Sequence, residues 1–193
     1  MGDGYHHGNL RQALIDAGIK IINEEGESKL SLRKTAALCK VSHAAPYAHF
    51  ANKEELVKAI KDSVTEQFTE DLTGAVEEAG NAEEALLRMG KAYVCFFIRK
   101  PDYFRFLFGG QMIVAHINAD REYKEDYPPF VLLKNTYLRY IKEKKLKRSS
   151  EERELDIIDL WSRVHGLAAL ACMSGVTTSI DWEDKLAGDL LIR

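Results

Sequence analysis

The chain has 193 residues, a formal net charge of −3 and 46% hydrophobic residues, which is typical of one ordinary globular domain or two small ones. Apolar stretches such as residues 93–98 are far shorter than the roughly 20 residues that a membrane-spanning helix needs, and the polar start MGDGYHHGNL shows no secretory signal. The three cysteines are too few and too scattered for a disulfide framework or a zinc cluster. We therefore expect no membrane segment, no metal, no cofactor, and a location in the reducing cytoplasm.

The charge is spread unevenly along the sequence. Residues 1–60 carry eight Lys and Arg against seven Asp and Glu, whereas the remaining residues carry nineteen against twenty-three. Four of the six histidines also lie in the first 60 residues. This asymmetry permits a nucleic-acid-facing region on an acidic body but does not by itself require one.

Helical periodicity dominates the first part of the chain. Apolar residues recur at helical spacing from Leu10 to Ile21, and Gly26 is placed to end that helix. Ser31 and Ser42 are N-cap residues for two short helices, which end near Cys39 and Phe50. Asn52 followed by Glu55 has the spacing of a capping box and opens a long helix toward Gly80.

The second part of the chain is predicted to be helical as well. Five further helices are expected, starting near Asn81, Pro101, Pro128, Ser149 and Asp181. The first of them becomes apolar all round at residues 93–98, so it is predicted to be central and buried, and residues 120–127 form a charged loop. With no hairpin or βαβ pattern, the sequence predicts an all-α fold of about nine helices.

The two short helices have the dimensions of a helix-turn-helix, because only Lys40-Val41-Ser42 separates them. Ala36 is small enough to let the second short helix cross the first closely. A little core is expected beneath this crossing, formed by Leu32, Val41, the ring stem of Tyr47, and Phe50.

This arrangement would leave residues 42–45 at the exposed N-terminal end of the second short helix, where a recognition helix meets base edges. The free N–H groups and the positive dipole end would favour phosphate there. Tyr47 and His49 add hydrogen-bond donors, and Lys53 adds a positive charge.

Residues 5–60 resemble the DNA-binding region of the tetracycline-repressor (TetR) family of bacterial transcription regulators. The resemblance is carried by the run from Leu30 to Leu56, which contains the Val-Ser turn, the Tyr-x-His-Phe run and the following Lys-Glu-x-Leu at the family's spacing. It implies a three-helix head at residues 8–68, joined by a long helix to a ligand-binding and dimerisation bundle at residues 69–193. The DNA-binding residues that it implies are Ser31, Arg33, Ser42, His43, Ala44, Ala45, Tyr47, His49 and Lys53.

Three positions depart from an ordinary helix-turn-helix of this kind. Lys40 stands where the family usually has a glycine, in a turn that often needs a positive φ. Cys39 replaces the usual alanine. Pro46 would lie at the fourth helical position, where it removes the first hydrogen bond within the helix.

The second part of the chain resembles one subgroup of the same family, which a Trp-x-x-x-His-Gly element marks. Here the element is Trp161 to Gly166, and the Pro101 to Gly109 stretch also matches. In the family the last two helices form the dimer interface, which implies interface roles for Gly166, Ala169 and Met173 on a helix of small residues. The expected effector pocket is aromatic, with Tyr93, Phe97, Phe104, Phe108 and Trp161 as lining and His165 as a polar contact. Aromatic residues at helical spacing fit a plain core equally well.

The resemblance implies a homodimeric, non-enzymatic regulator that binds a palindromic operator on double-stranded DNA, most simply a repressor released by an unidentified small molecule. An enzyme built on a helical bundle has little support, because no nucleophile pair, phosphate loop or Glu-x-x-His motif is present. A module that kept the head but lost DNA binding is a third hypothesis, with Lys40 as its only indication. Three alternatives remain open: that Tyr47 is a core aromatic, that His49 is a solvated side chain, and that His43 makes no contact with a base.

Overall fold

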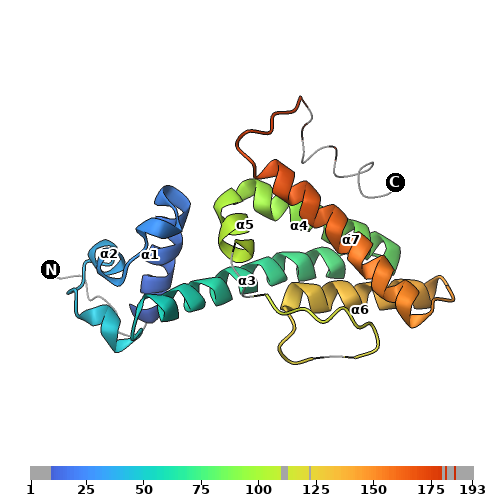
Figure 1. Ribbon diagram of the computed structural model, residues 1–193, viewed down its shortest axis with the longest axis horizontal. Helices are drawn as coiled ribbons and strands as arrows, with labels where there is room; N and C mark the ends of the chain where they lie inside the picture. Colours follow the sequence, from blue (N-terminus) through green and yellow to red (C-terminus); the bar gives the residue numbers. More distant parts are fainter. Residues whose placement is uncertain (1–9, 110–112, 122, 180, 182–184, 186–193) are drawn as a thin grey trace. The chain divides into compact units, whose positions relative to one another are not determined.

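The computed structural model describes residues 10–109, 113–121, 123–179, 181 and 185. Within these residues every regular element is a helix, which confirms the all-α fold class. The elements are α1 (Leu10–Glu25), the 3₁₀ helix η2 (Glu27–Lys29), α2 (Leu32–Leu38), the 3₁₀ helix η3 (Ala45–Ala48), α3 (Lys53–Glu77), α4 (Ala82–Arg99), α5 (Pro101–Phe108), α6 (Pro128–Glu143) and α7 (Ser150–Ala171) (Figure 1).

The predicted number of nine helices is wrong for the part of the chain that the structure describes, which has seven α-helices. One difference is the predicted helix at residues 42–50, which is the four-residue 3₁₀ helix η3. The helix predicted after Asp181 lies almost entirely outside the described residues. No helix among those described is long and apolar enough to cross a membrane.

The chain divides into two compact units, which we call unit 1 (through Val64) and unit 2 (from Thr65). Helix α3 is continuous across this division, since it begins at Lys53 and ends at Glu77. The first part of α3 therefore belongs to unit 1 and the remainder to unit 2.

The core of unit 1 forms where α1, α2 and the start of α3 meet. Its buried apolar side chains are Leu14, Ile15, Ile21, Ile22, Leu30, Leu32, Ala36, Phe50, Leu56 and Ile60. Gly18 of α1 faces Ile60 of α3 so closely that a Cβ there would collide with the isoleucine side chain. The absence of a side chain at Gly18 thus lets the two helices approach each other.

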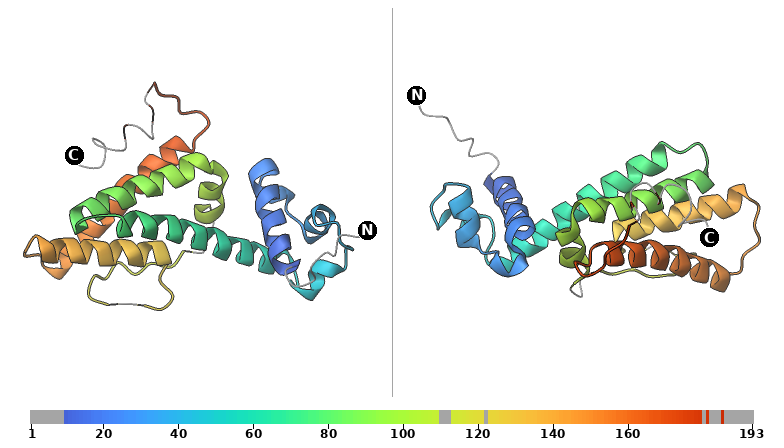
Figure 2. Two further views of the ribbon diagram at one scale, coloured as in Figure 1. Left: turned by 180° about the vertical axis from the view of Figure 1, so that it is seen from behind. Right: turned by 90° about the horizontal axis from the view of Figure 1, so that it is seen from above.

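Helix α4 is the centre of unit 2, as its apolar sequence predicted. It packs against α5, α6 and α7, and Figure 2 shows α7 running beside it in both views. Its residues Tyr93, Val94, Cys95, Phe96 and Phe97 are all buried. The ring of Phe68, from α3, adds to this core with centroid distances of 5.0, 4.8 and 4.8 Å to Tyr93, Phe96 and Phe97.

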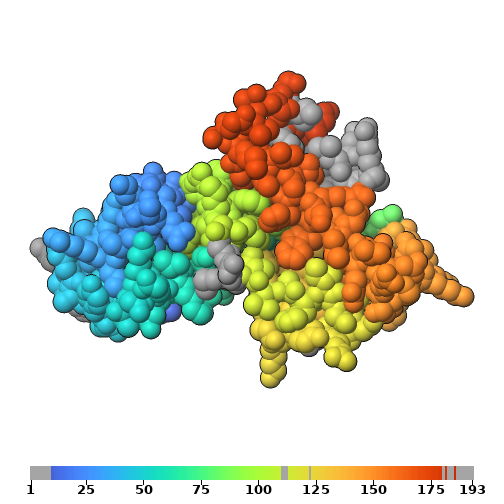
Figure 3. Space-filling model, in the orientation of Figure 1, coloured from blue at the N-terminus to red at the C-terminus, as the bar shows by residue number. Residues whose placement is uncertain are grey.

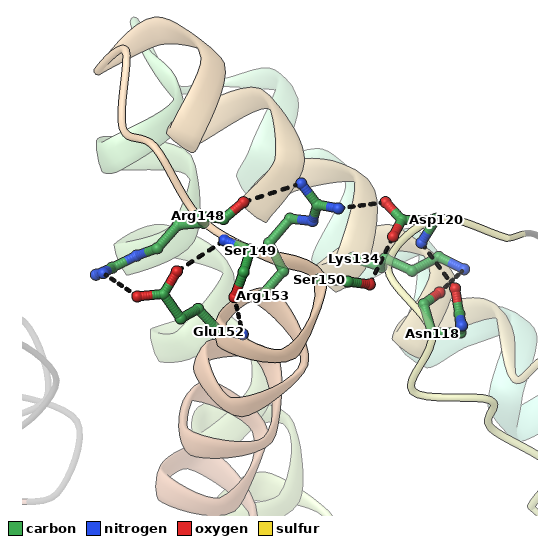
Figure 4. Close-up of polar contacts among 8 residues, drawn as sticks. All are labelled: Asn118, Asp120, Lys134, Arg148, Ser149, Ser150, Glu152 and Arg153. Atoms are coloured by element: carbon green, nitrogen blue, oxygen red, sulfur yellow. Dashed lines mark hydrogen bonds and ion pairs between the residues drawn. The ribbon is translucent and has the colours of Figure 1, made fainter.

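The irregular segment before α6 is fixed to the bundle by polar contacts (Figure 4). The carboxylate of Asp120 accepts hydrogen bonds from Ser150 Oγ (2.6 Å) and from the Arg153 guanidinium (2.5 Å), both on the first turn of α7. The side chain of Lys134, on α6, is 1% exposed, and its ammonium group donates to the carbonyl oxygen of Arg121 at 2.6 Å. Tyr127 ends the segment directly before α6, and its backbone N–H donates to the Val114 carbonyl at 2.8 Å.

Candidate functional site

The first functional element of unit 1 is the start of α2. Ser31 is the N-cap, as predicted, and its hydroxyl accepts a hydrogen bond from the Lys34 N–H at 3.2 Å. This role accounts for the half-buried position of Ser31. Arg33, two residues further along, is exposed to solvent.

A Schellman motif ends α2 and forms the turn of the helix-turn-helix. The Lys40 N–H bonds the Ala37 carbonyl at 3.1 Å, and the Val41 N–H bonds the Ala36 carbonyl at 3.1 Å. The motif needs a left-handed residue at its centre, and Lys40 adopts that conformation with φ 56°. The expected positive φ at Lys40 is therefore confirmed, and a lysine bears the steric cost that a glycine would avoid.

The second short helix is less regular than the sequence predicted. It is a 3₁₀ helix, Ala45–Ala48, and the residue that precedes it is Ala44, without a side-chain cap. Ser42 is thus not the N-cap by side chain that we expected. Pro46 explains the difference, because it has no N–H to donate and its ring opposes an α-helical turn before it.

A four-residue 3₁₀ helix also weakens the predicted role of the helix dipole, which needs several aligned peptide units. Any binding of phosphate at this element would therefore depend on the exposed side chains. The exposed residues here are Ser42, His43, Ala44, Tyr47, Ala48 and His49.

Tyr47 does not belong to the small core under the turn, which corrects our expectation for its ring. Its side chain is 59% exposed, whereas Pro46 beside it is buried. Of the other residues predicted for this core, Leu32 and Phe50 are buried and Val41 is half-buried. The exposed ring and hydroxyl of Tyr47 are therefore free to contact a partner molecule.

A side-chain cap fixes the start of α3, shortly after η3. The Asn52 side chain accepts a hydrogen bond from the Glu55 N–H at 2.9 Å, while the Glu55 carboxylate accepts one from the Ala51 N–H at 2.7 Å. This reciprocal cap has the predicted spacing, and it fixes the position of Lys53 at the first turn. Lys53 and Ala45 are half-buried, unlike the other predicted DNA-binding residues after the turn.

Lys40 is exposed at the turn between the two short helices, although it was not predicted as a binding residue. It was treated only as a departure from the usual glycine. Its position next to Val41 and Ser42 in the Schellman motif adds a positive charge to this part of unit 1. A lysine at the turn position where the family usually has a glycine is the sequence signal for this additional positive charge.

In unit 2, the predicted aromatic pocket residues divide into two groups. Tyr93 and Trp161 line a cavity of about 60 Å³, together with Leu86, Leu87, Met89, Gly90, Tyr127, Pro129, Phe130, Leu133, Leu160, Arg163 and Val164. Phe97, Phe104, Phe108 and His165 do not line this cavity. The sequence did not predict the cavity-lining role of Tyr127, Phe130 and the leucines, because their spacing is the one found on any buried face.

The remaining aromatic residues surround His165. The centroid of its ring lies 4.9 Å from that of Phe104 and 4.7 Å from that of Phe108, and Nδ1 lies 2.9 Å from the Tyr93 hydroxyl. Burial lowers the pKa of His165, so the neutral imidazole is favoured at neutral pH. His165 thus connects the aromatic cluster to Tyr93, which lines the cavity.

A wider and more open groove of about 380 Å³ adjoins the cavity, and Leu86, Leu87 and Leu160 line both. The acidic residues of the groove are already paired. Asp156 accepts a hydrogen bond from the Tyr137 hydroxyl at 2.5 Å and lies 3.1 Å from Arg148. Among the described residues no group of three His, Cys, Asp or Glu side chains is placed to hold a metal ion.

The predicted dimer residues lie on the final helix of the described chain. Gly166 is exposed, Ala169 is half-buried, and Met173, just after α7, is 53% exposed. Large apolar side chains of α7 are exposed as well, among them Leu155 (58%), Ile158 (41%) and Leu170 (45%). In the space-filling view α7, in orange, lies open on the surface of unit 2 (Figure 3).

Unit 1 is thus a helix-turn-helix with an exposed polar second element, and unit 2 is a helical bundle with an apolar cavity. Residues 14–60 match the model of the bacterial regulatory proteins of the tetR family. Over 67 residues the chain is 37% identical to a nicotine-responsive transcriptional repressor, HdnoR, of Paenarthrobacter nicotinovorans, covering 35% of this chain and 34% of that protein. Over 82 residues it is 29% identical to the transcriptional regulator BetI of Rhizobium meliloti, covering 41% of this chain and 40% of BetI.

The chain therefore spans between a third and two fifths of the length of these named relatives. Solved structures match over nearly the whole chain. A protein of unknown function from a Rhodococcus species has a TM-score of 0.78 at 22% identity, covering 98% of this chain and 95% of that one. PfmR, a TetR family regulator of Thermus thermophilus, has a TM-score of 0.60 at 17% identity, covering 90% of this chain and 92% of PfmR.

The similarity to the tetR family model is thus carried by residues 14–60, and the two named relatives are transcriptional regulators. HdnoR is a transcriptional repressor and BetI a transcriptional regulator. The subgroup with the Trp-x-x-x-His-Gly element stays a prediction, because the family model matches residues 14–60 and does not include Trp161 to Gly166.

Proposed function

We propose that this chain is a sequence-specific DNA-binding transcriptional regulator that acts as a homodimeric repressor in the cytoplasm. Each head, assigned to residues 8–68, would bind one half-site of a palindromic operator in the major groove. The observation that carries the proposal is the α2–turn–η3 geometry, where a Schellman motif is followed by four exposed polar residues, Ser42, His43, Tyr47 and His49.

In this proposal the residues of unit 1 have different tasks. Arg33, Lys53 and the capping region at Ser31 contact the DNA backbone and set the register. Ser42, His43, Ala44 and Ala45 face the base edges, and Tyr47 and His49 add contacts from exposed positions. The adjoining cationic residue Lys40 strengthens the electrostatic attraction.

The second unit, assigned to residues 69–193, would form the dimer and bind a small effector. Gly166, Ala169 and Met173, with the exposed leucines of α7, offer an apolar face for a second copy of the chain. Because α3 runs without interruption from Lys53 to Glu77, a change among the helices of unit 2 has a direct structural path to unit 1. Effector and operator affinity must then be coupled reciprocally.

The experiment that tests the proposal is a selection of bound duplexes from a random pool, with the purified full chain at moderate salt. We expect an enriched palindrome for the natural protein and none for Tyr47→Ala. Tyr47→Phe is the matched control, because it keeps the exposed ring and removes only the hydroxyl. Enrichment that is indifferent to Tyr47→Ala, or no enrichment by the natural protein, would overturn the proposed function.

A further inference from the structure

The helix-turn-helix lies in a stretch of the chain that has no acidic residue. Residues 28–53 contain no Asp or Glu, although the whole chain carries 30 of them and has a formal net charge of −3. The basic residues of the same stretch are Lys29, Arg33, Lys34, Lys40 and Lys53. The positive charge of unit 1 is therefore concentrated on the elements that the proposed function places against DNA.

Lys40, in the turn, is a cation without an anionic partner. Its side chain is exposed, and it forms no ion pair or hydrogen bond with any of the described residues. Other lysines of unit 1 are already paired, since Lys34 binds Glu25 and Lys58 lies 2.7 Å from Asp62. A phosphate would have to compete with a carboxylate for those two lysines but not for Lys40.

The backbone of the turn fixes where this charge lies. The two hydrogen bonds of the Schellman motif hold Lys40 in the left-handed conformation, with φ 56°, two residues before Ser42. Glycine adopts this conformation without steric cost, whereas a lysine does not. A residue that persists in an unfavourable backbone conformation is a reason to look for a function of its side chain.

A second lysine provides an internal comparison. Lys145 has φ 54° and is also exposed, and it stands in the same motif at the end of α6. Its N–H bonds the Lys142 carbonyl at 3.2 Å, and the Leu146 N–H bonds the Ile141 carbonyl at 2.9 Å. Lys145, however, lies only two residues after Glu143. The backbone conformation alone thus indicates no function, and what distinguishes Lys40 is its surroundings without acidic residues, next to the exposed helix-turn-helix residues.

We propose that Lys40 directly contacts a phosphate of the DNA backbone, beside the bases that Ser42 and His43 face. This inference rests on the proposed DNA-binding function and adds a contact made by the turn itself. Because η3 has only four residues, its peptide dipoles attract a phosphate weakly, and a cation in the turn supplies that attraction. A lysine ammonium group is a point charge on a flexible stem, so this contact adds affinity and register without reading the sequence.

The test measures how DNA binding of the full chain depends on salt. Fluorescence anisotropy is recorded between about 50 and 200 mM salt with two labelled duplexes, the palindrome from the selection and a mixed-sequence duplex of equal length. Lys40→Gln removes the charge and keeps the Cβ, so the turn conformation is equally strained. Each phosphate contact contributes about 0.9 to the slope of log affinity against log salt.

We expect Lys40→Gln to reduce this slope by about 0.9 for each bound head, on both duplexes alike. The affinity advantage of the natural protein over the variant should therefore shrink by about 3.5-fold per head between about 50 and 200 mM salt. Lys40→Arg keeps the charge and should keep the slope.

Two variants separate the phosphate contact from an effect on the fold. Lys145→Gln removes a lysine of the same conformation from unit 2 and should leave the slope unchanged. Lys40→Gly relieves the turn, so it should raise the melting temperature and yet show the same reduced slope as Lys40→Gln. Loss of affinity in a more stable protein cannot come from unfolding.

An unchanged slope for Lys40→Gln, while the natural protein binds DNA, would overturn this inference and leave the proposed function intact. A changed sequence preference with an unchanged slope would also overturn it, because Lys40 would then contact a base. The mixed-sequence duplex tests the contact even when the selection yields no palindrome. If the natural protein binds neither duplex at low salt, the proposed function and this inference are both refuted.

Discussion

The hydroxyl of Tyr93 on α4 lies 2.9 Å from Nδ1 of His165 on α7, and the two residues are 72 positions apart in the sequence. The contact links the central helix of unit 2 to the helix whose apolar residues are exposed. Because the imidazole is surrounded by Phe104 and Phe108, its other interactions are mainly with aromatic rings.

This environment predicts a pH dependence of stability. The pKa of His165 is lowered by burial, so the folded state binds fewer protons than the unfolded state, where histidine titrates near ~6.5. The free energy of unfolding should therefore be intact above pH ~6.5 and fall as the pH is lowered below that value. Urea unfolding of His165→Gln between pH 7 and 5 should show a shallower decline than that of the natural protein, and parallel curves would contradict the assignment.

The left-handed conformation of Lys40 gives a prediction for unit 1. Replacing Lys40 by glycine should raise the free energy of unfolding by roughly 0.5–1 kcal/mol, because φ 56° costs a residue with a Cβ more than it costs glycine. Lys40→Ala removes the same charge and keeps the Cβ, so it should bring no such gain. Equal thermal unfolding curves for the glycine and alanine variants would show that the turn is not strained.

The buried Lys134 of α6 gives a prediction for the stability of unit 2. Its side chain is 1% exposed, its Nζ lies 4.0 Å from the buried Asp126, and it donates to the Arg121 carbonyl. Lys134→Met would leave that carboxylate without its buried cation, and we expect a loss of about 3 kcal/mol in chemical denaturation. Lys124→Met changes an exposed lysine of the neighbouring segment and should have an effect below about 0.5 kcal/mol.

The division of tasks in the DNA-binding region is testable by salt dependence. Lys53→Ala should weaken binding to all duplexes alike and reduce the slope of log affinity against log salt by about one, since one phosphate contact is lost. His43→Ala and Ala45→Gly should instead change the preferred sequence. A change of preference caused by Lys53→Ala would show that our division between backbone and base contacts is wrong.

The proposed dimer face predicts a change of oligomeric state. Met173→Asp introduces a charge at a position that is 53% exposed in the single chain and would be buried between two copies. We expect sedimentation to show a monomer for this variant and a dimer for the natural protein. Leu146→Asp, at a residue that is 42% exposed after α6, is the control and should leave the dimer intact.

Much of the fold follows from local sequence signals. Ser31 was predicted as a cap from its residue type, and Asn52, Asn81 and Ser149 were predicted at helix starts from a glutamate three residues later. Each of the four side chains accepts a capping hydrogen bond. These features are local, because a cap is formed by residues three positions apart. The left-handed conformation of Lys40 was expected on other grounds, from the glycine that the resembling family usually has in this turn.

The tertiary structure alone decided which aromatic residues line the cavity and which pack around His165. Tyr93, Phe97 and Phe104 have similar spacing and chemistry in the sequence, yet only the first lines the cavity. The exposure of Tyr47 could not be predicted from the sequence either. Helical periodicity identifies an apolar face, but contacts between residues far apart in the chain determine what that face meets and where space is left.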